Sequence, residues 1–85
     1  MRLFIASIPY EVDESELFAM FKRYSVAWVK LVRDDAGRSR GFGFAEIEID
    51  SLADLAIAEL DGSILAGRRI AVTRAEDRRA ATRQR

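Results

Sequence analysis

Apolar positions along this chain first alternate with other residues, then recur at helical spacing, and later alternate again. Residues 2 to 8 (RLFIASI) are rich in strand-forming side chains, and Pro9 blocks continuation of a strand. Asp13 and Glu16 have the spacing of a capping box at a helix start. The helical apolar face that follows consists of Leu17, Met20, Phe21 and Tyr24. The pattern predicts a strand, then a helix that ends near Ser25.

A β-hairpin is predicted in the middle of the chain. Residues 26 to 33 (VAWVKLVR) alternate well enough for a strand, and a third strand is expected at about 40 to 48. The sequence DDAG between them is rich in turn-forming residues. Two adjacent strands joined by so short a turn are expected to pair antiparallel.

The remainder predicts a second helix and a last strand. Asp50 or Ser51 can cap the helix, and Asp61 and Gly62 can end it. Its apolar face consists of Ala53, Ala56, Ile57 and Leu60. A last strand, RRIAVT, occupies residues 68 to 73. The order βαββαβ predicts an α+β fold, the ferredoxin-like split βαβ sandwich, with a four-stranded antiparallel sheet and both helices on one face.

The third strand contains RGFGFAEI, in which two phenylalanines alternate with two glycines. Successive strand side chains point to opposite faces of a sheet. Ala45 and Ile47 suit the helix-covered face, where small glycines permit close approach of a helix. Phe42 and Phe44 are then predicted to lie on the uncovered face, where large apolar side chains call for an explanation.

The first strand adds a third aromatic to the same face. Leu3 and Ile5 suit the core, so Phe4 is expected on the open face beside the third strand. Aromatic rings on an open sheet, flanked by arginines, can stack unpaired bases. A core strand in another register, or a sheet covered by the C-terminal tail, is the structural alternative.

From about residue 2 to residue 75 the chain resembles the RNA recognition motif (RRM) family. Residues 40 to 44 fit the family's octamer signature position by position, whereas Ala45 and Ile47 replace the usual Val and aromatic. The hexamer signature is similar to LFIASI at residues 3 to 8, with Ser7 where Asn or Gly is usual. The resemblance implies single-stranded RNA as the partner, with single-stranded DNA left open.

The same resemblance implies roles for individual side chains. Phe4 and Phe44 would each stack a base, Phe42 would lie against the sugars, and Arg40 would pair with a phosphate. In a simple antiparallel hairpin, Lys30 lies beside Phe44 and could contact a phosphate or a base edge.

Four further positions carry weaker expectations. Trp28 could stack a base, cap the core edge or pair with the tail, and Arg38 could contact a phosphate or belong to a solvated turn. Thr73 and Arg74 are expected where bound nucleic acid would leave the sheet. The Arg-rich tail at 76 to 85, outside the domain at 1 to 75, could extend an electrostatic groove or only aid solubility.

Composition restricts the function classes. The 85 residues suffice for one domain, and 14 basic against 14 acidic residues argue weakly against a nucleic-acid binder. Histidine and cysteine are absent, so no enzyme, cofactor or metal site is predicted. No long apolar run or signal peptide is recognised, which favours a cytoplasmic protein similar to the stand-alone RRM proteins of bacteria. A piece of a longer chain remains an alternative.

A competing hypothesis is a protein-interaction domain of the same fold. It could use the sheet, or the outer side of the helices, where Phe18 and Leu55 are each one step off the predicted buried stripe. Partial burial at the helix flanks is the plain explanation for both side chains. Zero net charge favours this competing hypothesis, whereas three aromatics at base-stacking positions favour RNA.

Overall fold

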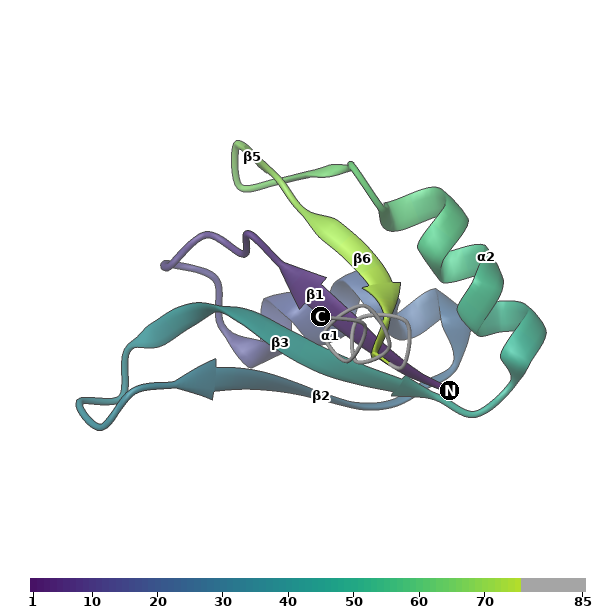
Figure 1. The fold of residues 1–85 in the computed structure, drawn as a ribbon, viewed down its shortest axis with the longest axis horizontal. Coiled ribbons are helices and arrows are strands. Elements are labelled where there is room, and N and C mark those ends of the chain that lie inside the picture. Colours follow the sequence, from purple (N-terminus) through teal and green to yellow (C-terminus); the bar gives the residue numbers. More distant parts are fainter. Residues whose placement is uncertain (76–85) are drawn as a thin grey trace, which may run out of the picture.

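The computed structural model describes residues 1 to 75, so the predicted tail at 76 to 85 lies outside the described residues. Figure 1 shows the arrangement of the elements. In chain order these are β1 (Arg2–Ala6), α1 (Glu14–Phe21), the 3₁₀ helix η1 (Lys22–Tyr24), β2 (Val26–Arg33), β3 (Ser39–Ile47), α2 (Asp50–Leu60), β4 (Ile64–Leu65), β5 (Arg68–Arg69) and β6 (Ala71–Arg74).

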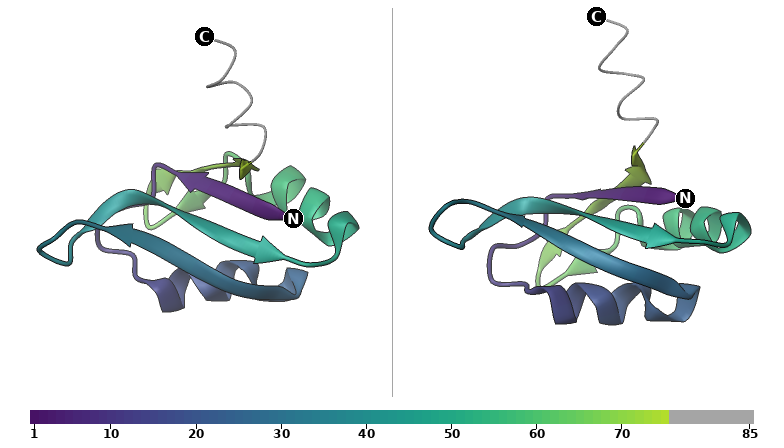
Figure 2. Two further views of the ribbon diagram at one scale, coloured as in Figure 1. Left: turned by 60° about the horizontal axis from the view of Figure 1, so that its bottom comes forward. Right: turned by 90° about the horizontal axis from the view of Figure 1, so that it is seen from below.

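Four strands form one antiparallel sheet in the order β2-β3-β1-β6. Figure 2 shows α1 beneath this sheet, and α1 packs mainly on β2 whereas α2 packs on β6 and β3. The buried core consists of Leu3, Ile5, Ile8, Val12, Leu17, Phe21, Tyr24, Leu31, Ala45, Ile47, Ala53, Ala56, Ile70 and Val72. The predicted ferredoxin-like βαββαβ fold, with one sheet face covered by helices, is confirmed.

The β1–α1 region follows the prediction except at the end of the strand. β1 ends at Ala6 rather than at residue 8, because Ser7 adopts a positive φ of 62° that leaves the extended region. The capping box is confirmed: the Glu16 amide donates to Asp13 Oδ1 at 3.0 Å, and the Asp13 amide donates to Glu16 Oε1 at 3.3 Å. Ser25, with φ 56°, ends η1 in the left-handed conformation.

Gly43 has a different role from the one predicted. A Cβ at this position would overlap the carbonyl oxygen of Lys30, which belongs to the neighbouring strand. Strand β2 carries register irregularities at both ends of its pairing with β3. The glycine therefore permits close approach of a strand backbone, not of a helix.

Two predictions for the second half of the chain are wrong. Neither Asp50 nor Ser51 caps α2: the N-cap is Ile49, which is extended and makes no side-chain bond, and Asp50 is already helical. An acidic residue in the first turn still interacts favourably with the helix dipole.

The last strand is also divided. Residues 68 and 69 pair with β4 across a two-residue turn in which Ala66 and Gly67 both have positive φ, and only β6 joins the main sheet. A second, small antiparallel hairpin therefore interrupts the predicted strand.

Candidate nucleic-acid interface

A row of four side chains crosses the face of the sheet that the helices of residues 1 to 75 leave uncovered. The register pairs Lys30 with Phe44, Phe44 with Phe4, and Phe4 with Thr73, so one residue comes from each of the four strands. Alternation explains their common face, because the residues before and after Phe4 and Phe44 are all fully buried or nearly so. The face that carries these four residues and Phe42 is called the open face below.

Phe4 lies in contact with both other phenylalanines of the open face. The ring centre of Phe4 lies 5.8 Å from that of Phe42 and 5.6 Å from that of Phe44, with planes inclined by 42° and 60°. These are ordinary separations for tilted aromatic pairs. Each ring is half-buried, so each retains surface in contact with water.

Two cations border the phenylalanines. The Arg40 guanidinium lies 5.9 Å from the centre of the Phe42 ring, and Lys30 is exposed beside Phe44. Within residues 1 to 75, neither Lys30 nor Arg40 forms an ion pair. Both charges are therefore available to a phosphate without displacing a described carboxylate.

The end of the open face beyond Phe44 is occupied by an internal charge cluster. Trp28 pairs in register with Glu46, and the Arg2 guanidinium lies 5.1 Å from the Trp28 ring. Arg2 also bonds Glu46 at 3.3 Å, and the amino terminus lies 3.4 Å from the same carboxylate. One side of the Trp28 ring is thus in contact with Arg2, although 38% of the residue stays exposed.

Arg38 lies in the β2–β3 hairpin, which projects at the left of Figure 1. Its Nε bonds Asp34 Oδ2 at 3.2 Å, while Asp34 Oδ1 accepts the backbone amides of Ala36 and Arg38. Arg38 is therefore held by a carboxylate that also shapes the turn.

Arg33 at the base of the same hairpin is directed to helix α1. It bonds Glu14 at 2.6 Å and the carbonyl of Gly37 at 2.8 Å. The Arg33 hydrogen bond lowers the pKa of the Glu14 carboxyl, and the same bond raises the pKa of Arg33. This pair fastens the hairpin to α1 and is not part of the open face.

Arg74 ends β6 on the side of the sheet that faces the helices. It pairs in register with the buried Leu3, so it shares the helical side of the sheet, and its Nη2 bonds Asp54 of α2 at 3.1 Å. Thr73, its neighbour, is exposed on the open face. Alternation separates these two expected contacts onto opposite faces.

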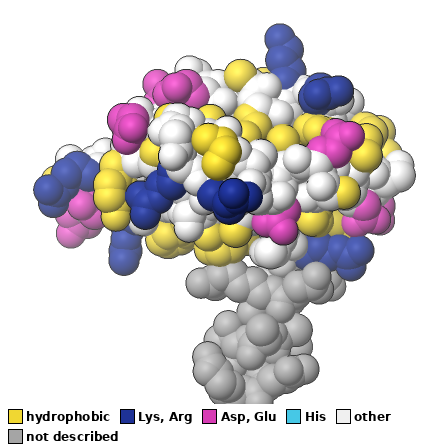
Figure 3. All heavy atoms as spheres, turned by 90° about the horizontal axis from the view of Figure 1, so that it is seen from above, with side chains coloured by type: hydrophobic (Ala, Val, Ile, Leu, Met, Phe, Trp, Pro, Cys, Tyr) yellow, Lys and Arg dark blue, Asp and Glu magenta, His cyan; other side chains and the backbone are white. Residues whose placement is uncertain are grey.

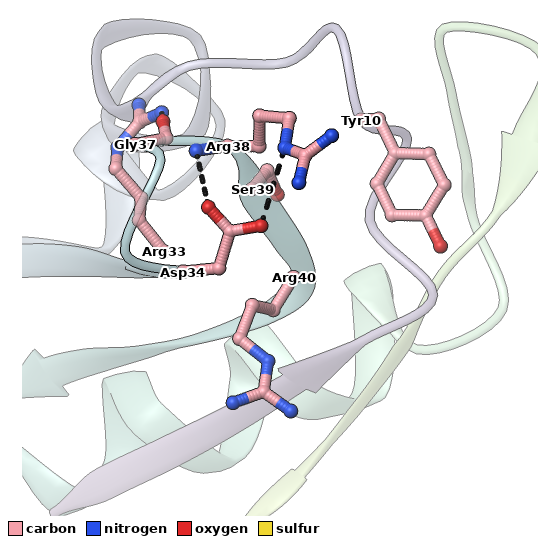
Figure 4. Close-up of a pocket in the computed structure, with 7 residues that line it drawn as sticks. All are labelled: Tyr10, Arg33, Asp34, Gly37, Arg38, Ser39 and Arg40. Carbon is pink, nitrogen blue, oxygen red and sulfur yellow. Dashed lines mark hydrogen bonds and ion pairs between the residues drawn. The ribbon is translucent and has the colours of Figure 1, made fainter.

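Tyr10 is an exposed aromatic that the sequence reasoning missed. It is 69% exposed in the β1–α1 loop and lines a hollow of about 710 Å³ together with Arg33, Asp34 and residues 37 to 40 (Figure 4). The available signal was its position directly after Pro9, outside both predicted periodic segments.

The RNA recognition motif model matches residues 3 to 71 of the chain. The chain belongs to the RNA recognition motif family. It is 41% identical over 80 residues to RbpA of Synechocystis, covering 92% of this chain and 79% of that protein. It is 39% identical to the Arabidopsis thaliana chloroplast RNA-binding protein CP31B, covering 91% of this chain and 27% of that one.

Solved structures agree with this RRM assignment. The crystal structure of RNA-binding protein PG1 has a TM-score of 0.84 and 35% identity, covering 88% of this chain and 93% of that one. The Sxl-lethal protein in complex with RNA has a TM-score of 0.83 and 25% identity, covering 87% and 46%.

The helical side of this RRM carries isolated exposed apolar residues. Phe18 is 37% and Leu55 is 44% exposed, as predicted, and neither takes part in an aromatic pair among the described residues. Figure 3 shows the molecule from above Figure 1, on the edge formed by β5, β6 and α2, where basic and acidic side chains are interspersed. These features contrast with the clustered rings and unpaired cations of the open face.

Residues 1 to 75 contain no cluster of three or more carboxylate, histidine or cysteine side chains that could hold a metal ion. No helix in that part of the chain has the length and hydropathy needed to cross a membrane.

Proposed function

We propose that this RRM binds single-stranded RNA on the open face of its sheet and performs no chemistry on it. The single observation that carries the proposal is the row in which Phe4 and Phe44 pair between Lys30 and Thr73. Aromatic rings accept bases of any sequence, and cations beside them hold the phosphates. About two to four nucleotides would occupy a surface of this kind.

Each side chain has a role in the proposal. Phe4 and Phe44 each stack a base, and Phe42 lies against the sugars between them. Because the Phe4 and Phe44 planes differ by 60°, two bases stacked on these rings would not be parallel to each other. A strand bound here would therefore be splayed rather than continuously stacked.

The remaining polar and charged side chains contribute unequally to RNA binding. Arg40 and Lys30 contact phosphates, with Lys30 also within reach of a base edge, and Thr73 offers a hydroxyl at the β6 end of the row. Trp28 is a weaker contact because Arg2 already lies against its ring. Arg74 contributes little, since Asp54 holds it on the helical side.

RNA binding in relatives supports the proposal. CP31B and PG1 are named RNA-binding proteins, and the Sxl-lethal protein is seen with RNA. A cytoplasmic location and a non-catalytic role are part of the same proposal. Protein partners at Phe18 and Leu55 are the competing outcome.

The test is a titration of the isotopically labelled protein with random-sequence single-stranded RNA and, separately, DNA, following the backbone amide signals. We expect the shifts to gather on β1 and β3, around Phe4 and Phe44, with smaller shifts at Lys30 and Thr73. A titration with both nucleic acids that moves no signal at low salt would refute the proposal. Larger shifts with DNA than with RNA would change the ligand but keep the surface.

A further inference from the structure

The hollow between the β1–α1 loop and the β2–β3 hairpin adjoins the open face and shares Arg40 with the function proposed above, but its other residues have no role there. It combines one exposed aromatic ring with the side chains of Arg38 and Arg40 (Figure 4). An aromatic ring beside guanidinium groups is the combination that holds an unpaired base and its phosphate.

The backbone fixes the position of Tyr10. The Val12 amide donates to the Pro9 carbonyl at 3.1 Å, so Tyr10 lies at the corner of a turn. The residues on either side of the turn are anchored, because Ile8 is 1% and Val12 is 2% exposed. The Ile8 amide also donates to the Gly41 carbonyl at 2.8 Å, which ties the loop to β3. The anchored turn therefore keeps Tyr10, which is 69% exposed, at a fixed position on the surface.

Gly41 connects this ring to the open face. A Cβ placed on Gly41 would lie 3.3 Å from Tyr10 Cε1, so the ring packs against the backbone of β3 between Arg40 and Phe42. Gly41 has φ 84°, and its amide donates to Ser39 Oγ at 3.1 Å. A side chain at this position would be strained and would crowd the tyrosine. Arg40 links the two regions, because it lines the hollow and also lies 5.9 Å from the centre of the Phe42 ring.

Arg38 and Arg40, on the other side of the hollow, differ in their partners: Arg38 has an ion pair and Arg40 has none among residues 1 to 75. Arg38 extends from the hairpin toward Tyr10 in Figure 4, held through Nε by Asp34, and its side chain is 78% exposed. Its terminal amino groups make no hydrogen bond to residues 1 to 75, and Arg40 makes no ion pair with them. Asp34 repels a phosphate, so the anion is expected on the side of these amino groups that faces away from Asp34.

We propose that Tyr10, Arg38 and Arg40 form a further nucleotide subsite. Tyr10 stacks one unpaired base of the bound RNA, and the two arginines hold the adjoining phosphate. This inference rests on the proposed function, because the same strand must already lie on Phe42 and Phe44. The subsite lengthens the bound segment past the end of the sheet.

The experiment compares a random-sequence RNA trinucleotide with a random-sequence octanucleotide, with affinities taken from amide shift titrations. Tyr10→Ala is expected to lower octanucleotide affinity about fivefold or more, the equivalent of the weakest base–aromatic stack, and to leave trinucleotide affinity unchanged. Tyr10→Phe keeps the ring and should keep both affinities. Ile64→Ala, a change at a 59% exposed residue of β4, is the matched control.

Each result has a distinct meaning. The subsite would be overturned if Tyr10→Ala left the octanucleotide affinity unchanged. It would also be overturned if Tyr10→Ala melted at the wild-type temperature but lowered the affinity for both RNA lengths equally. Phe44→Ala should weaken both lengths, since it removes a ring of the sheet itself. A wild-type protein that binds neither RNA would refute the proposed function, and with it this inference.

Discussion

The two faces of strand β3 differ in how completely their side chains are buried. Ala45 and Ile47 have no exposed surface and lie against the helices. Phe42 and Phe44, in the same strand, are half-buried and contact Phe4 and the bordering cations. Burial is complete on one face and incomplete on the other, although the side chains on the incomplete face are larger.

The open face keeps apolar surface in contact with water, so a ligand that covers it can still gain hydrophobic free energy. Apolar surface left in water would yield about 25 cal/mol per Å² when a ligand covers it. On the helical face that gain has already stabilised the fold. Lys30 and Arg40 keep the open face from becoming a second core, because a charged side chain resists burial without a partner.

The largest expected effect is on the core face. Ile47→Ala should lower the free energy of unfolding by about 2–5 kcal/mol, since it removes packed methyl groups and leaves a cavity. Urea denaturation of the purified protein measures this change. Phe44→Ala is the comparison, and it should cost less because that ring is half-buried. Equal losses would mean that the open face contributes to the core.

The second effect is on RNA binding. Phe44→Ala should weaken binding of single-stranded RNA by about 1–3 kcal/mol, because it removes a stacking ring. Fluorescence anisotropy with a labelled random-sequence octanucleotide measures the change. Phe18→Ala is the matched control, an exposed phenylalanine on the helical side whose loss should leave affinity unchanged. A loss in the control alone would favour the competing interaction surface on the helices.

The two faces could be assigned from sequence because strand periodicity leaves little freedom. A shift of one residue in β1 or β3 would bury the bulky Phe4 or Phe44 on the helix-covered face and expose Leu3 or Ala45. The pairing of Lys30 with Phe44 followed from the short hairpin, and it is confirmed. Local pattern was sufficient wherever a residue's neighbours in space were set by alternation.

Contacts that join distant segments could not be predicted from local pattern. The ion pair of Arg74 with Asp54, which is 20 residues earlier in the chain, is one example. The close approach at Gly43 depends on the backbone of Lys30 in the next strand, and the small hairpin of β4 and β5 depends on positive φ at Ala66. Tyr10 was missed because a loop carries no periodicity that marks a side chain as exposed.

The third, smaller effect is on the salt dependence of RNA affinity, because Lys30 lies on the open face and Arg74 on the helical side. Lys30→Gln should reduce the slope of log affinity against log salt by about 0.7, the value for one phosphate contact with a single strand. Arg74→Gln should leave the slope unchanged, since Asp54 holds that guanidinium on the helical side. Affinities measured across a series of salt concentrations decide between them. An equal change for both would mean that Arg74 leaves Asp54 when RNA binds.

The smallest effect concerns stability on the helical side and its dependence on pH. The amide of Glu16 donates to Asp13, which lowers the pKa of the Asp13 carboxyl below its ordinary 3.8. A carboxyl whose pKa is lower in the folded state stabilises the fold fully above 3.8, and this contribution is lost as pH falls through the lowered folded value.

Asp13→Asn should remove that dependence while keeping a side chain able to cap α1. Thermal unfolding over a range of acidic pH would then show a shallower fall in melting temperature for the variant than for the wild type. The Glu14 carboxyl, whose pKa is lowered by Arg33, should titrate in both proteins and supply the fall that remains. Identical slopes would mean that the capping carboxylate contributes nothing measurable to the helical side.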